Sequence, residues 1–138
     1  MGRNRRTWLS RMALLALLAS APGCGEELGP VPFPTTRVAG RVSEGPQPIR
    51  GGWIEFLPVD GTVGDLRSAP IGRDGSFDAD KVAIGLNQIG LADAPSGAIL
   101  APRFPTFRSP IRRVIPAGQS TPLNIDLVEE AIRRRQAP

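Results

Sequence analysis

Histidine and tyrosine are absent from this 138-residue chain, and it has only one lysine and one cysteine. The absence of histidine removes the commonest general base and the commonest metal ligand. No serine can be activated by a histidine, and a single lysine leaves little scope for Schiff-base chemistry. We therefore expect no catalytic residue, no enzymatic activity and no cofactor.

Most of the chain also has no excess of positive over negative charge. The whole sequence has 17 basic and 13 acidic residues, but four of its arginines and none of its acids precede Cys24. The part that begins at Cys24 is therefore formally neutral. The overall charge of the chain gives no support to a nucleic-acid partner, and we expect none.

The first 23 residues have the organisation of a secretory signal peptide. Arg3–Arg11 form a positive region, Met12–Ala21 an apolar run, and Pro22-Gly23-Cys24 a small-residue exit. The apolar run is about half of the roughly 20 residues that a stable transmembrane helix requires. Residues 1–23 are therefore predicted to form a transient export helix and not a permanent anchor.

The exit resembles the bacterial lipobox, in which small residues precede a cysteine that receives diacylglycerol before the leader is removed. Gly23 and Cys24 fit this pattern, whereas Ala21 replaces its usual leucine. Because Cys24 is the only cysteine, it cannot form an internal disulfide. The resemblance implies a lipid on Cys24 that anchors the protein in a membrane. The alternative is a leader cut after Ala19 or Ala21, which would release a soluble secreted domain.

The export route has two interpretations. Asn4–Leu9 resembles a twin-arginine signal, which would require folding before translocation, but paired arginines also occur in ordinary positive regions. Either Sec or Tat export would deliver the chain to the cell envelope. We therefore expect an exported, membrane-anchored protein by one of these routes.

Residues 24–36 are interpreted as a tether between the anchor and a domain. Pro30, Pro32 and Pro34 alternate there and favour an extended polyproline II conformation. A proline-rich recognition ligand is the other interpretation, but the basic residues that usually flank such ligands are missing. Such a segment suits a semi-rigid spacer that lifts a domain off a lipid anchor.

From Arg37 onward, short apolar-alternating runs separated by glycine and proline are typical of a small all-β domain. Val38, Gly40 and Val42 are expected on one face of the first strand. The later strands are predicted at Trp53–Leu57, Leu66–Ile71, Asn87–Ala92 and Thr121–Leu127, with one short helix at 127–135. The tryptophan, phenylalanine and aliphatic side chains at 53–57 are predicted to be core.

Glycine and proline mark the connections between these runs. Ser43–Gly51 is predicted to be a loop, and Asp60-Gly61 a turn. Asp74-Gly75 is predicted to be the turn of a hairpin that leads into Ser76-Phe77. The elements are therefore expected to be consecutive antiparallel strands.

Val38–Val42, Pro48–Gly51, Trp53–Pro58 and Gly72–Phe77 together resemble the carboxypeptidase regulatory-like domain. In that family a V-x-G-x-V strand precedes a proline and glycine loop, a strand ending near F-x-P, and a D-G-x-F hairpin. The usual glycine-x-tyrosine strand is replaced by Gly85–Ile89. The resemblance implies a transthyretin-like (prealbumin-like) Greek-key β-sandwich of about seven strands, without catalytic residues. It would occupy 37–128, before a polar basic tail at 129–138.

Asp74, Ser76, Asp78 and Asp80 alternate as the ligands of a calcium loop do. An EF-hand loop, however, requires glycine where Ala79 lies and an acidic residue where Gly85 lies. The simpler interpretation is a turn followed by solvent-facing acids, with Asp74, Asp78 and Asp80 as weak metal candidates.

The segment Ala94–Pro116 mixes arginine with phenylalanine, a combination that is enriched at binding hot spots. The candidate interaction residues are Arg103, Phe104, Phe107 and Arg108. In the alternative interpretation the phenylalanines anchor a long loop while the arginines face solvent. Arg133–Arg135 are expected to form a solvated tail, and contact with anionic lipid headgroups is the weaker alternative.

Two classes of function remain after these exclusions. The first is a lipid-anchored structural or interaction module of the cell envelope that binds protein or polysaccharide. The second is an accessory lipoprotein that binds an ion or ligand, with calcium at the Asp74–Asp80 turn. The first class is preferred, because the acidic pattern departs from a calcium loop at two positions.

Overall fold

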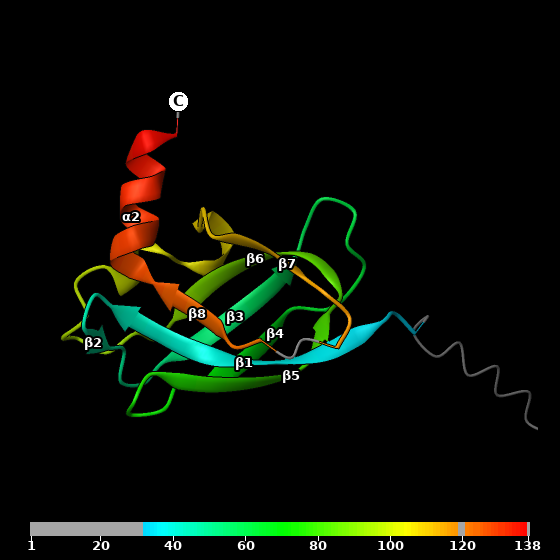
Figure 1. The fold of residues 1–138 in the computed structure, drawn as a ribbon, viewed down its shortest axis with the longest axis horizontal. Helices are drawn as coiled ribbons and strands as arrows, with labels where there is room; N and C mark the ends of the chain where they lie inside the picture. Colours follow the sequence, from blue (N-terminus) through cyan, green and yellow to red (C-terminus); the bar gives the residue numbers. More distant parts are fainter. Residues whose placement is uncertain (1–31, 119–120, 138) are drawn as a thin grey trace, which may run out of the picture. The chain divides into compact units, whose positions relative to one another are not determined.

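The computed structural model describes residues 32–118 and 121–137. Two four-stranded sheets in this part of the chain share one hydrophobic core, which confirms the all-β sandwich (Figure 1). Eight strands are found there, against about seven expected, and one of them has only two residues. In chain order the described elements are β1 Thr35–Glu44, β2 Gln47–Pro48, β3 Trp53–Pro58, β4 Arg67–Pro70, β5 Ser76–Ala83, β6 Gly85–Ala92, η1 Ala101–Arg103, η2 Thr106–Arg108, β7 Arg112–Ile115, β8 Leu123–Asp126 and α2 Leu127–Gln136.

One sheet is built around β1, which pairs with three other strands. β5 is antiparallel to β1 along 35–41, and the two-residue β2 pairs with its last residues. β8 is parallel to β1, with Gly40 opposite Leu123 and Ser43 opposite Asp126. This parallel pair departs from the expectation of consecutive antiparallel strands and brings the last strand of the chain beside the first.

The other sheet has the order β4-β3-β6-β7, and all its pairs are antiparallel. β7 lies in the segment 94–116, for which no strand was predicted, and it pairs with residues 85–88 of β6. The sequence Arg-Arg-Val-Ile has no period-two alternation. β7 is therefore specified by its pairing partner and not by a local pattern.

The core follows the alternation of the strands, with one correction. Val38 and Val42 of β1 are buried, as are Ile54 and Phe56 of β3. Trp53, predicted to be core, is 43% exposed. Neighbouring residues of a strand face opposite sides, so the inward direction of Ile54 places Trp53 on the outer face.

The turn at Asp74-Gly75 forms as predicted, but it does not close a hairpin. Gly75 has φ of +80°, which glycine adopts without strain. The turn joins β4 of one sheet to β5 of the other, so the two strands are not partners. Asp60-Gly61 is a turn as predicted, and the expected loop 43–51 contains β2.

Gly40 allows β8 to approach β1 closely. A Cβ atom at this position would lie 1.9 Å from the carbonyl oxygen of Leu123, so any side chain would separate the two strands. Close contact between β1 and β8 therefore requires glycine at position 40. The predicted Thr121–Leu127 strand is shorter than expected, because Leu127 already belongs to α2.

The helix predicted at 127–135 is confirmed as α2. Its first turn contains Glu129 and Glu130 and its last turn contains three arginines, so both ends complement the helix dipole. Leu127 and Glu130 are buried against the sandwich. The expected boundary between sandwich and tail, at 128/129, therefore falls inside a packed helix.

Candidate functional site

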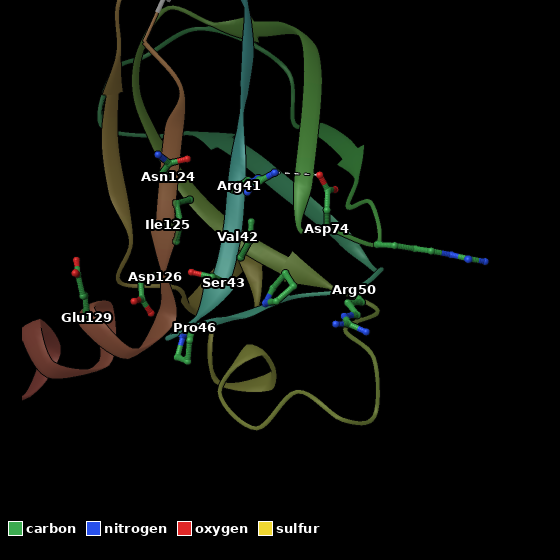
Figure 2. Close-up of a pocket in the computed structure, with 12 residues that line it drawn as sticks. Arg41, Val42, Ser43, Pro46, Arg50, Asp74, Asn124, Ile125, Asp126 and Glu129 are labelled. Carbon is green, nitrogen blue, oxygen red and sulfur yellow. Dashed lines mark hydrogen bonds and ion pairs between the residues drawn. The ribbon is translucent and has the colours of Figure 1, made fainter.

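A polar groove of about 670 Å³ lies at the end of the β1 sheet, where α2 begins (Figure 2). Residues from β1, β8, the turn after β1 and the turn before β5 line it. Its polar lining residues are Arg41, Ser43, Arg50, Arg73, Asp74, Asn124, Asp126 and Glu129.

The parallel pairing of β1 and β8 positions the middle of the groove. Arg41 lies opposite Asn124, and Ser43 lies opposite Asp126. Because residues two apart in a strand share a face, these four side chains belong to one face of the sheet. Val42 and Ile125, which lie between them, are buried in the core.

Asp126 holds together the elements that form one wall of the groove. Its Oδ1 accepts a hydrogen bond from the backbone N–H of Val128 at 2.9 Å, which caps α2. The same oxygen accepts from the N–H of Gly45 at 2.9 Å. A single carboxylate therefore ties the turn after β1 to the start of the helix.

The opposite wall carries an ion pair and two further cations, Arg50 and Arg73. Arg41 Nη2 lies 3.3 Å from Asp74 Oδ2. The hydroxyl and N–H of Ser76 also donate to Asp74, and with Arg41 they hold the pKa of this carboxyl below its ordinary value. Arg50 and Arg73 form no hydrogen bond or ion pair with the described part of the chain.

These groups give the groove the chemistry of a binding site for polar ligands. Two unpaired guanidinium groups can each donate to a carboxylate or phosphate in a forked geometry. The side chains of Ser43 and Asn124 can donate to, or accept from, hydroxyl groups. The arrangement therefore fits a hydrated ligand that carries an anionic group.

The candidate metal ligands have other partners. Arg37 forms an ion pair with Asp78 and lies 4.0 Å from Asp80, while Arg41 pairs with Asp74. The hydrogen bond from Arg37 lowers the pKa of the Asp78 carboxyl. Among the described residues, no three histidine, cysteine, aspartate or glutamate side chains are grouped so as to hold a metal ion.

The candidate interaction residues of the segment 94–116 divide into two kinds. Phe104 is 1% exposed, so its assignment to a recognition surface is corrected: it fills the core. The Phe104 carbonyl accepts a hydrogen bond from the N–H of Leu91 in β6. Arg103 and Arg108 are exposed, and Phe107 is 75% exposed.

Cys24, the export leader and most of the tether lie outside the described residues, so the lipid anchor stays a prediction. Within 32–118 and 121–137, no helix is both long and apolar enough to cross a bilayer. The chain matches no family model, no curated protein and no solved structure.

Sequence reasoning did not identify Arg50 and Arg73. Each lies next to glycine in a connection, at Arg50-Gly51-Gly52 and Gly72-Arg73-Asp74. An arginine at an exposed turn is a weak signal of binding, because most such residues are only solvated. The groove itself depends on the pairing of β1 with β8, which no local pattern indicates.

Proposed function

We propose that this protein is an exported, non-catalytic envelope lipoprotein, anchored by a lipid on Cys24, whose β-sandwich binds protein or polysaccharide. In this proposal the sandwich is a carboxypeptidase regulatory-like domain, in keeping with the V-x-G-x-V and D-G-x-F motifs. The chain carries none of the histidines on which most acid–base catalysis relies. Binding is therefore the activity that its residues support best.

The observation that carries the binding role is the groove beside β8. Arg50 and Arg73 lie in its lining without partners among the described residues, next to the hydroxyl of Ser43 and the amide of Asn124. Ion pairs compensate other arginines on the same sheet, such as Arg37. Uncompensated guanidinium groups in a concave site are available for a ligand.

The short tether would keep this domain close to the membrane. From Cys24 to Pro32 an extended chain spans at most about 30 Å. A lipid on Cys24, with or without a further acyl chain, would restrict the domain to this layer. Its partner would therefore be another component of the envelope.

The anchor is tested by the intact mass of the membrane-extracted protein, for the wild type and for Cys24→Ser. The proposal expects a wild-type chain that starts at Cys24 with a diacylglycerol or triacyl mass, and a variant without that mass. A chain that starts elsewhere and carries no lipid would mean a soluble secreted domain.

Binding at the groove is tested by a photo-reactive amino acid at position 124, with position 65 as a control outside the groove. Crosslinks to an envelope component should form from position 124 and not from position 65. They should decrease in the Arg50→Gln, Arg73→Gln double variant. Equal crosslinking from both positions would exclude the groove as the binding site.

A further inference from the structure

Arginine side chains gather around the C-terminal half of α2. They come from α2 itself, from η1 and from β7. We name this surface the arginine face, and its residues are Arg103, Arg112, Arg113, Arg133, Arg134 and Arg135.

Two shallow grooves run along the sides of α2 within the arginine face. One, of about 310 Å³, is lined by Arg103, Arg134 and Arg135. The other, of about 280 Å³, is lined by Arg112, Arg113, Arg133 and again Arg134. Both volumes lie near the lower end of the roughly 300–1,000 Å³ typical of ligand sites.

Half of these arginines lack an acidic partner. Arg112 pairs with Asp60 at 2.7 Å, Arg113 with Glu130, and Arg133 with Glu129 at 3.6 Å. The guanidinium groups of Arg103, Arg134 and Arg135 form no ion pair or hydrogen bond with the part of the chain that the structure describes. The face therefore has an excess of about three positive charges beside two grooves.

Stabilisation of the helix accounts for only part of this charge. Cations in the last turn of a helix interact favourably with its dipole, which is sufficient reason for Arg133–Arg135. It gives no reason for Arg103, which comes from η1 and lines the same groove as Arg134 and Arg135. A repeating anion that follows the helix would contact all of them.

The position of the arginine face bears on which anion it meets. Because β8 is parallel to β1 and ends opposite Ser43, α2 begins at the end of β1 that is remote from Thr35. Thr35 and Ser43 are separated by about 26 Å of strand. The groove that holds the three unpaired arginines lies at this remote end, because Leu100 in its lining donates its N–H to Glu44, the last residue of β1. If the tether anchors the domain as proposed above, this groove lies at the end of the domain opposite to the tether's attachment.

We propose that the arginine face binds an acidic polysaccharide of the envelope. Guanidinium groups form forked, charge-assisted hydrogen bonds with carboxylate or phosphate oxygens. A polymer with one anion per sugar, or per few sugars, would engage several arginines at once. The choice of a polysaccharide over anionic lipid rests on the proposed anchor, whereas the binding itself does not.

The experiment uses the full chain in mild detergent, with immobilised polygalacturonate as the acidic polymer and dextran as the uncharged control. The wild type should bind polygalacturonate and not dextran, and added salt should weaken binding by screening the charges. The triple variant Arg103→Gln, Arg134→Gln, Arg135→Gln should bind at least about tenfold more weakly.

A matched control removes three cations that lie outside both the arginine face and the groove of Figure 2: Arg37→Gln, Arg67→Gln, Lys81→Gln. This variant should keep near wild-type affinity. Equal loss in the triple variant and the control would reduce the effect to net charge, and loss in the Arg50→Gln, Arg73→Gln double variant but not in the triple variant would assign binding to the groove of Figure 2; either result overturns the proposal.

Two further outcomes are decisive. Failure of the wild type to bind polygalacturonate overturns the proposal, as does binding to vesicles with 30% phosphatidylglycerol but not to the polymer. Polymer binding that persists in Cys24→Ser would keep the arginine face as a polyanion site even if the mass measurement showed no lipid. The lipid anchor on Cys24 and the polyanion site on the arginine face can therefore be disproved independently of each other.

Discussion

Gly90 lies directly beneath Thr106, and the two residues fix η2 to the outer face of the β3 sheet. A Cβ atom at Gly90 would come within 2.1 Å of the Thr106 Cα. The Thr106 hydroxyl donates to Glu55 on the neighbouring strand, and its carbonyl accepts from Gln88 Nε2 at 2.6 Å. The absence of a side chain at position 90 therefore allows the loop to lie on the sheet.

Gly90→Ala should destabilise the protein by about 2 kcal/mol or more, because overpacking a tight contact usually costs about 1–3 kcal/mol. Urea denaturation would measure this change in the free energy of unfolding. Gly97→Ala is the control in the same loop, since no atom lies within 4 Å of its Cβ position. Similar curves for the two variants would mean that η2 does not press on β6.

Arg113→Met should destabilise the docking of α2, because it removes a partner of Glu130, whose side chain is only 9% exposed. Loss of one partner from a fully buried pair costs about 3–5 kcal/mol. Arg113 is partly exposed and Arg133 also reaches Glu130, so we expect about 2 kcal/mol. Arg112→Met, whose partner Asp60 is exposed, should cost less than about 1 kcal/mol in the same urea titration.

Asp126→Ala should remove the cap of α2 and the bond to Gly45 together. Loss of an N-cap side chain costs about 1 kcal/mol, and we expect somewhat more here because the carboxylate has a second partner. Asp126→Asn keeps an oxygen acceptor and should retain most of the stability. Equal losses of melting temperature in Asp126→Asn and Asp126→Ala would contradict this role.

Acid should weaken the β1–β5 pair through Asp78. Its pKa in the folded protein is lowered, first by the hydrogen bond from Arg37 and then by the charge of Arg37. The unfolded chain therefore binds protons at higher pH than the folded chain. This contribution is fully present above the unfolded pKa of about 4 and is lost as pH falls through the lower folded value.

Denaturation curves between pH 6 and pH 2 would measure this effect. Asp78→Asn should flatten the acid limb, and Arg37→Gln should flatten it in the same way because it removes the donor. Both groups are exposed, so the change should be small and should shrink further in 0.5 M salt. An unchanged acid limb in both variants would exclude the pair as its source.

The local patterns of the sequence predicted most of the strands and the helix. Alternation of apolar residues located β1, β3 and β6, because one face of each strand contributes its apolar side chains to the core. The same rule, applied residue by residue, would have placed Trp53 outside, since it neighbours the inward Ile54. Its size and apolar character led to the wrong prediction.

Pairings between distant segments could not be predicted in this way. Asp74-Gly75 indicates a turn but not which sheet the next strand joins, and β7 has no pattern of its own. The candidate groove depends on β8 beside β1, and the arginine face depends on η1 and β7 beside α2. Both sites are assembled by tertiary structure from residues that look ordinary in sequence.

The parallel pair of β1 and β8 also determines when the fold can be completed. Gly45 and Asp126, joined by a hydrogen bond, are 81 residues apart in the chain. Such non-local contacts slow folding, because a long loop must close before they form. If the chain crosses a membrane unfolded, the β1 sheet stays incomplete, with an open edge, until the last residues have emerged. Residues 123–138, which contain β8 and α2, would then act as the closing step of maturation, and truncating the chain before β8 would leave an aggregation-prone edge.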